Sequence, residues 1–207
     1  MPRLRVREDN ADRLWEAYYQ AGDLIVVNLL WVVTSLPVIT AVPALGALFH
    51  ATNRLAHGSS AGWRVFWEGF REQFWLSWRW AAINAAAFGV LGVNVWFYGW
   101  VDADWAGAVQ TAFVILLALW GELTLFTFPL LLEQSDRRFV TALRNSAVML
   151  LRQPGPVLWA VLLVLAVAVP SVLILPPAWI IISGSLCAYL ANRAVVQAIR
   201  AMKESSG

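Results

Sequence analysis

Long apolar runs separated by short polar segments dominate the chain. The first run is broken by Pro37 and Pro43. Proline disfavours helix at the residue before it, so this run predicts two short helical arms, Leu24–Leu36 and Val42–Ala56. Each arm is about 13–15 residues long, near 20 Å of helix, which is shorter than the roughly 30 Å of a bilayer's hydrocarbon core.

Four later apolar runs are long enough to cross a bilayer, which takes about 20 residues of helix. They predict spans at Ala81–Trp100, Ala106–Leu132, Val157–Leu175 and Ala178–Ala194. The alternating polarity of a membrane β-barrel is not visible. The pattern therefore predicts an all-α, polytopic helical membrane protein that forms a single integral membrane domain over residues 1–207.

Two further segments, 63–78 and 137–151, are amphipathic at helical spacing. A helix with this pattern lies flat at the membrane interface. The same pattern also suits a helix that docks in a groove of a partner protein. The first segment predicts an interfacial aromatic face on one side and charged residues on the other. That face consists of Trp63, Phe66, Trp67, Phe70 and Phe74.

Composition supports the membrane class. The 207 residues are 60% hydrophobic and only 14% charged, whereas soluble domains carry about a quarter charged residues. Most of the thirteen tryptophans lie at the ends of apolar runs, as in the aromatic belts of membrane proteins. The basic residues lie between the apolar runs and not on one surface, which argues against nucleic-acid binding.

The distribution of arginine predicts the topology, because cytoplasmic loops are enriched in Lys and Arg. A short, proline-broken hairpin at 11–56 places all fifteen basic residues on one side. If this segment crossed the membrane only once, four of the fifteen basic residues would be translocated to the outer side. With transmembrane hairpins at 81–132 and 157–197, we expect about six membrane-entering helices. Both termini are then cytoplasmic in a bacterial plasma membrane.

Glu122 is the sharpest candidate for intramembrane chemistry. A charged group at mid-bilayer costs on the order of 2.5–3.5 kcal/mol on insertion scales, and usually faces a bundle interior or a cavity. It would act as a proton relay, or as a protonated group bonded to Asn84, Thr124 or a backbone carbonyl. The other candidates for this intramembrane polar site are Asn28, Thr40, His50, Arg54 and Asn84.

His50 and Arg54 lie one helical turn apart. Either they pair with Glu122, or Arg54 marks the cytoplasmic interface and His50 is an interior residue whose hydrogen bonds are satisfied. Asn28 and Thr40 line the broken hairpin, whose break either binds substrate, as such breaks do in transporters, or merely caps two short helices. The chain has two histidines, one cysteine and no catalytic, cofactor-binding or metal-binding motif. We expect no enzyme and no cofactor.

The segment around the proline turn resembles the YesL-like family of bacterial membrane proteins. The resemblance rests on Asn28–Trp31, Leu36–Thr40, Pro43-Ala44 and Phe49, and on the later FWEGFREQFWLS and ALRNSAVMLLRQP segments. Val42 stands where the family more often has glycine. The resemblance implies a non-enzymatic accessory or regulatory role in carbohydrate uptake, with a carbohydrate ABC transporter or a sensor protein as partner. The alternative is a small secondary transporter or channel that uses the broken hairpin and Glu122.

Overall fold

The computed structural model describes the backbone of residues 2–204 and the side chains of residue 15 and of residues 18–204. This part of the chain contains no strand, so the predicted all-α class is confirmed for it. The elements are α1 (Pro2–Ser35), α2 (Val38–Ala56), α3 (Trp63–Glu72), α4 (Phe74–Tyr98), α5 (Ala106–Glu133), α6 (Phe139–Arg152), α7 (Pro154–Leu173), α8 (Pro176–Ala178), the π-helix η1 (Trp179–Ser183) and α9 (Gly184–Glu204).

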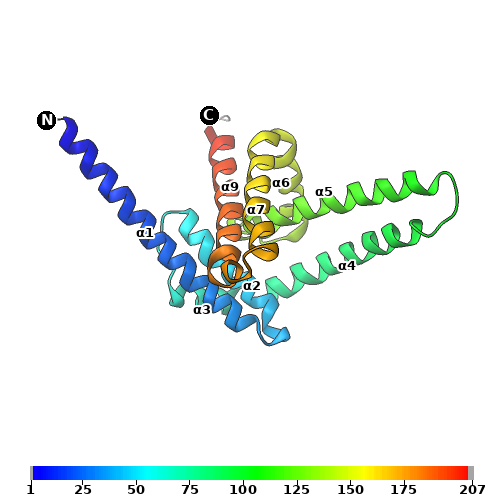
Figure 1. The fold of residues 1–207 in the computed structure, drawn as a ribbon, viewed down its shortest axis with the longest axis horizontal. Helices are drawn as coiled ribbons and strands as arrows, with labels where there is room; N and C mark the ends of the chain where they lie inside the picture. Colours follow the sequence, from blue (N-terminus) through cyan, green and yellow to red (C-terminus); the bar gives the residue numbers. More distant parts are fainter. Residues whose placement is uncertain (1, 205–207) are drawn as a thin grey trace.

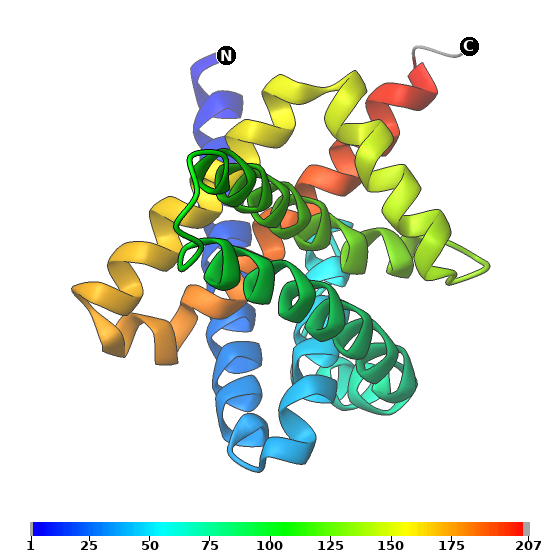
Figure 2. The same cartoon turned by 90° about the vertical axis from the view of Figure 1, so that its right-hand side faces the viewer.

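The chain reverses between α1 and α2, as the arginine distribution predicts. Figures 1 and 2 show α2 running back along the second half of α1. Pro37 has an extended backbone (φ −76°, ψ 124°) and directly precedes α2. The hydroxyl of Thr40 donates to the carbonyls of Thr34 (2.5 Å) and Pro37 (2.9 Å), and so closes the turn.

The predicted bounds of this hairpin are wrong at two places. Helix α1 begins at Pro2 and not near residue 11, and α2 begins at Val38 and not at Val42. Pro37 already supplies the fixed φ that suits the residue before a helix. Pro43 then lies inside α2, where its missing N–H removes a single bond of the helix.

The predicted helix at 63–78 is divided at Gln73. Helix α3 ends at Glu72, and α4 begins at Phe74 and continues through the span that was predicted at Ala81–Trp100. Gln73 has φ −93° and ψ 1°, and its side chain is fully buried. At this bend the side chain of Gln73 lies within hydrogen-bond reach of His50 in α2 and of Arg137 between α5 and α6.

Four helical stretches are long and apolar enough to cross a membrane: α4, α5, α7, and the stretch Pro176–Glu204 that ends in α9. Helices α4 and α5 form a hairpin that projects away from the other helices, across the direction of α7 and α9 (Figure 1). The α4–α5 tip points towards the viewer in Figure 2. The start of α1 and the end of α9 lie at the same end of the molecule in both views.

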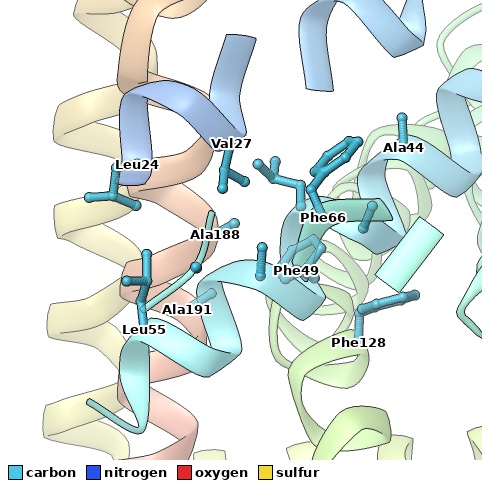
Figure 3. Packing of buried hydrophobic residues seen from close by; sticks show 13 residues of the cluster. Leu24, Val27, Ala44, Phe49, Leu55, Phe66, Phe128, Ala188 and Ala191 are labelled. Atoms are coloured by element: carbon cyan, nitrogen blue, oxygen red, sulfur yellow. The ribbon is translucent and has the colours of Figure 1, made fainter. Parts of the chain in front are cut away.

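Helix α2 lies at the centre and packs against α1, α3, α4, α5 and α9. Figure 3 shows side chains of this core, with Val27 from α1, Phe66 from α3, Phe128 from α5 and Ala191 from α9. The rings of Phe49 and Phe128 lie 5.2 Å apart. A second cluster joins the end of α5 to α6, α7 and α9. The core thus surrounds the predicted proline-broken hairpin, and the outer halves of α4 and α5 stay exposed.

Candidate functional site

The structure does not bring the predicted polar residues into one site. Glu122 of α5 lines a cavity towards α7, Asn28 lies against η1, and Thr40 lies in the first turn of α2. His50 and Arg54 face α3, and neither contacts Glu122 through a hydrogen bond or ion pair. Each group therefore has to be assessed in its own surroundings.

Glu122 is the candidate that combines a buried oxygen without a described partner and a place in the lining of a cavity. Its Oε1 is buried and has no hydrogen-bond partner among the described residues. The side chain lines a cavity of about 600 Å³ between the diverging helices α5 and α7. Every other lining residue is apolar or glycine: Ile115, Ala118, Leu119, Gly121, Leu125, Leu158, Val161, Val164 and Leu165.

The predicted internal partners of Glu122 bond elsewhere. The amide of Asn84 donates to the carbonyl of Trp80 (2.8 Å) and accepts from the indole N–H of Trp120 (3.1 Å). The hydroxyl of Thr124 donates to the carbonyl of Gly121. Asn84 therefore links α4 to α5, and the predicted bond of Glu122 to Asn84 or Thr124 is wrong.

Asn28 completes the backbone of a π-helix. It is fully buried, and its amide donates to the carbonyls of Trp179 (3.0 Å) and Ile180 (2.6 Å). Its Oδ1 accepts from the backbone N–H of Ser185 (2.7 Å). The hydroxyl of Ser185 returns a bond to the carbonyl of Leu24 in α1. Asn28 thus joins α1 to η1 and α9, and its polar groups are all used inside the protein.

His50 and Arg54 serve the contact between α2 and α3. Arg54 forms an ion pair with Glu68 (3.3 Å), in which both side chains are nearly half exposed. The Nδ1 of His50 lies 3.4 Å from the amide of Gln73, while its Nε2 is buried without a described partner. Of the two interpretations of these residues, the pairing with Glu122 is wrong, because α2 turns them towards α3.

The predicted aromatic face of 63–78 is divided between core and surface. Phe66 is fully buried in the core, whereas Trp63 is 57% exposed. Trp67, Phe70 and Phe74 continue as a chain of edge-on ring contacts. The prediction that the whole face meets the interface is wrong for Phe66, because α3 packs this side chain against α2.

Sequence reasoning missed a polar network where α2, α5 and α9 meet. Asn192 is fully buried and donates to the carbonyl of Phe49 and the hydroxyl of Thr52. Asn53 donates to Glu133 (2.7 Å), whose carboxylate also bonds His57 (2.8 Å). The available sequence signal was that Asn53 and His57 lie four residues apart at the end of α2, a helix that contains no acidic residue of its own.

Replacing Glu133 with alanine should lower the free energy of unfolding by about 1–2 kcal/mol, because the amide of Asn53 loses its close acceptor. Asn53 retains only a longer contact to Asn192 (3.4 Å). Unfolding in detergent micelles, followed by tryptophan fluorescence, measures the change. Glu68→Ala is the control, since its ion pair with Arg54 is exposed and should contribute little. Equal effects of the two substitutions would contradict the role given to the network.

One family model matches part of the chain. Residues 24–95 are similar to a protein family of unknown function, DUF624. This segment is about a third of the chain and contains Asn28, the proline turn, His50 and Asn84, but not Glu122. No curated protein matches the chain, and no solved structure matches it. In the described part, no three His, Cys, Asp or Glu side chains are grouped so that they could hold a metal ion.

Proposed function

We propose that this chain is a non-enzymatic integral membrane protein that acts through a partner, and that the partner places a transmembrane helix in the groove at Glu122. The observation that carries the proposal is the side chain of Glu122, which is the one polar side chain lining an otherwise apolar groove and whose buried Oε1 has no described partner. A carboxyl group within a bilayer is retained at a free-energy cost unless another group bonds to it. The ligand should therefore bring a hydrogen-bond donor or a cation.

The form of the groove favours a helix over a small polar solute. Leu119 of α5 and Leu158 of α7 are 42% and 50% exposed, so the cavity opens sideways towards the surroundings of the helices. A helix with small residues fits such a groove by van der Waals packing, and one polar side chain adds an interhelical hydrogen bond. A sugar carries several hydroxyl groups, and a groove with one carboxyl group would leave most of them without a hydrogen-bond partner.

The resemblance to the YesL-like family supports a more specific role for this partner. We assign the chain to an accessory or regulatory function in carbohydrate uptake, with an ABC transporter or a sensor protein as the partner. The setting is a bacterial plasma membrane with both termini cytoplasmic. In this proposal the α1–α2 hairpin enters the membrane beside the four long apolar helices, which gives six membrane-entering helices.

Site-specific photocrosslinking in membranes tests the proposed contact. A crosslinker at position 119 or 158 should capture one membrane protein, and mass spectrometry should place the crosslinked peptide in its transmembrane helix. A crosslinker at the exposed position Val93 of α4, which does not line the groove, is the matched control. Glu122→Leu should reduce capture at least fivefold, whereas Glu122→Gln, which keeps an acceptor, should reduce it less.

Capture that is equal at positions 93, 119 and 158, or unchanged by Glu122→Leu, would refute the groove as the contact site. Crosslinks to lipid alone would refute it as well. An identified partner unrelated to transport or sensing would leave the groove in place and overturn the carbohydrate assignment.

The alternative function is a small transporter or channel. A carboxyl group that lines a cavity, as Glu122 does, is also a candidate for a proton relay. Against this, Asn28 and Thr40 bond within the chain and lie apart from Glu122. Purified protein in liposomes should therefore move neither protons nor sugar. Proton flux that is lost in Glu122→Gln would favour the alternative and refute the accessory role.

A further inference from the structure

Three arginines surround one cavity at the base of the α4–α5 hairpin. The cavity measures about 550 Å³ and is lined by Arg79 of α4 and by Arg137 and Arg138 of the loop between α5 and α6. Asp136 is the one acidic residue in its lining. Three guanidinium groups against one carboxylate leave an excess of positive charge, which favours an anion.

The backbone at Arg137 holds this arrangement. Its φ of 46° lies in the left-handed region, where it is the only residue other than glycine in the described chain. Such a conformation is uncommon for arginine and persists where the surroundings maintain it. Here Nη1 of Arg137 donates to the buried Oε1 of Gln73 (3.3 Å), which fixes the arginine beside the bend between α3 and α4.

Internal bonds leave most of the positive charge unmatched. Asp136 bonds the hydroxyl of Thr141 (3.3 Å) and lies 4.0 Å from Nε of Arg138. Arg79 makes no hydrogen bond or ion pair with a described residue. Helix α6 begins beside the cavity without a side-chain cap, so its first N–H groups add to the positive potential.

The wall of the cavity gives the ligand an apolar part as well. Ile83 and Val140 are 39% and 77% exposed there. Trp80 lines the same cavity, and its indole N–H is a buried donor with no described acceptor. A free anion would use the arginines alone. A ligand with a phosphate and an alkyl chain would use both the arginines and the apolar wall.

We infer that this cavity binds the headgroup of an anionic phospholipid. The phosphate lies between Arg79 and Arg137, because arginine's planar fork matches phosphate oxygens with paired hydrogen bonds. The acyl chain lies against Ile83 along the exposed side of α4. This site is distinct from the Glu122 groove, and it does not depend on the function proposed for that groove.

Native mass spectrometry of the full-length protein tests the inference. The protein is purified in a lipid-free detergent and titrated with phosphatidylglycerol or phosphatidylcholine of the same chain length. We expect the first phosphatidylglycerol to bind at least fivefold more tightly than phosphatidylcholine. The variant Arg79→Gln with Arg137→Gln should lose this preference. The variant Arg144→Gln with Arg152→Gln, which removes the same charge from α6 outside this cavity, should keep it.

Three results would overturn the inference. An equal loss of affinity in both double variants would indicate general attraction between charges and no defined site. Equally tight binding of phosphatidylcholine and phosphatidylglycerol to the unaltered protein would rule out selection of an anionic headgroup. Complete displacement of the first lipid by millimolar inorganic phosphate would assign the arginines to a free anion. Tryptophan fluorescence melts of each variant show that any loss arises in folded protein.

Discussion

Asn28→Leu is expected to destabilise the fold by about 2–4 kcal/mol. Leucine has a similar volume, but it leaves the N–H of Ser185 and the carbonyls of Trp179 and Ile180 without the bonds that Asn28 provides. A buried polar group left unpaired costs about 1–3 kcal/mol. Interhelical hydrogen bonds in membrane proteins average only about 0.6 kcal/mol, which limits the total.

Asn94→Leu provides the matched control for this substitution. Asn94 lies on α4, and its amide makes one bond, to the carbonyl of Val90 one turn earlier. Removing that bond should change the free energy of unfolding by less than about 0.5 kcal/mol. Reversible unfolding by a denaturing detergent, followed by helical circular dichroism, compares the two variants. A loss for Asn28→Leu no larger than for Asn94→Leu would mean that Asn28 does not support η1.

The apolar pattern predicts much of this helical chain, because it depends on local sequence. Helix α5 at Ala106–Glu133 matches the expected span to within one residue, and α7 differs from its predicted bounds by a few residues. The reversal at Pro37 follows from proline chemistry and the distribution of arginine. These features need no knowledge of which helices are neighbours.

The fate of the polar residues depends on tertiary packing and could not be predicted. Nothing near Asn28 in sequence indicates that its partners lie more than 150 residues away, in η1. Likewise, a helical wheel gives Phe66 and Trp63 one shared face, but only the packing of α3 on α2 buries the first and exposes the second. At Gln73, where the predicted 63–78 helix is divided, the buried side chain likewise has partners that are distant in sequence, in α2 and the α5–α6 loop.

The directions of the helices are a further property that counting charges cannot give. Length and composition select α4, α5, α7 and the stretch ending in α9 as possible spans. Figure 1 shows the first two crossing the direction of the others, so the two hairpins do not stand parallel as in a simple bundle. This divergence is what leaves the cavity at Glu122 open between α5 and α7.

Gly69→Ala should destabilise the protein by about 2–3 kcal/mol, although alanine favours helix over glycine by about 0.5–1 kcal/mol. Gly69 is buried, and a Cβ added there would lie 2.7 Å from both Cβ and Cδ2 of His50. Since Cβ of His50 cannot rotate away, α3 has to move from α2, and Phe66 leaves the core with it. Gly89→Ala on α4 is the control, because a Cβ there meets nothing within 4 Å.

The two glycine variants should therefore move the unfolding midpoint in opposite directions, Gly69→Ala down and Gly89→Ala up. Adding His50→Ala to Gly69→Ala should restore only part of the loss, since the ring contact disappears while the contact with Cβ stays. Full recovery in that double variant would place the conflict on the imidazole ring alone. Equal midpoints for Gly69→Ala and Gly89→Ala would contradict the close packing of α3 on α2, on which the burial of Phe66 depends.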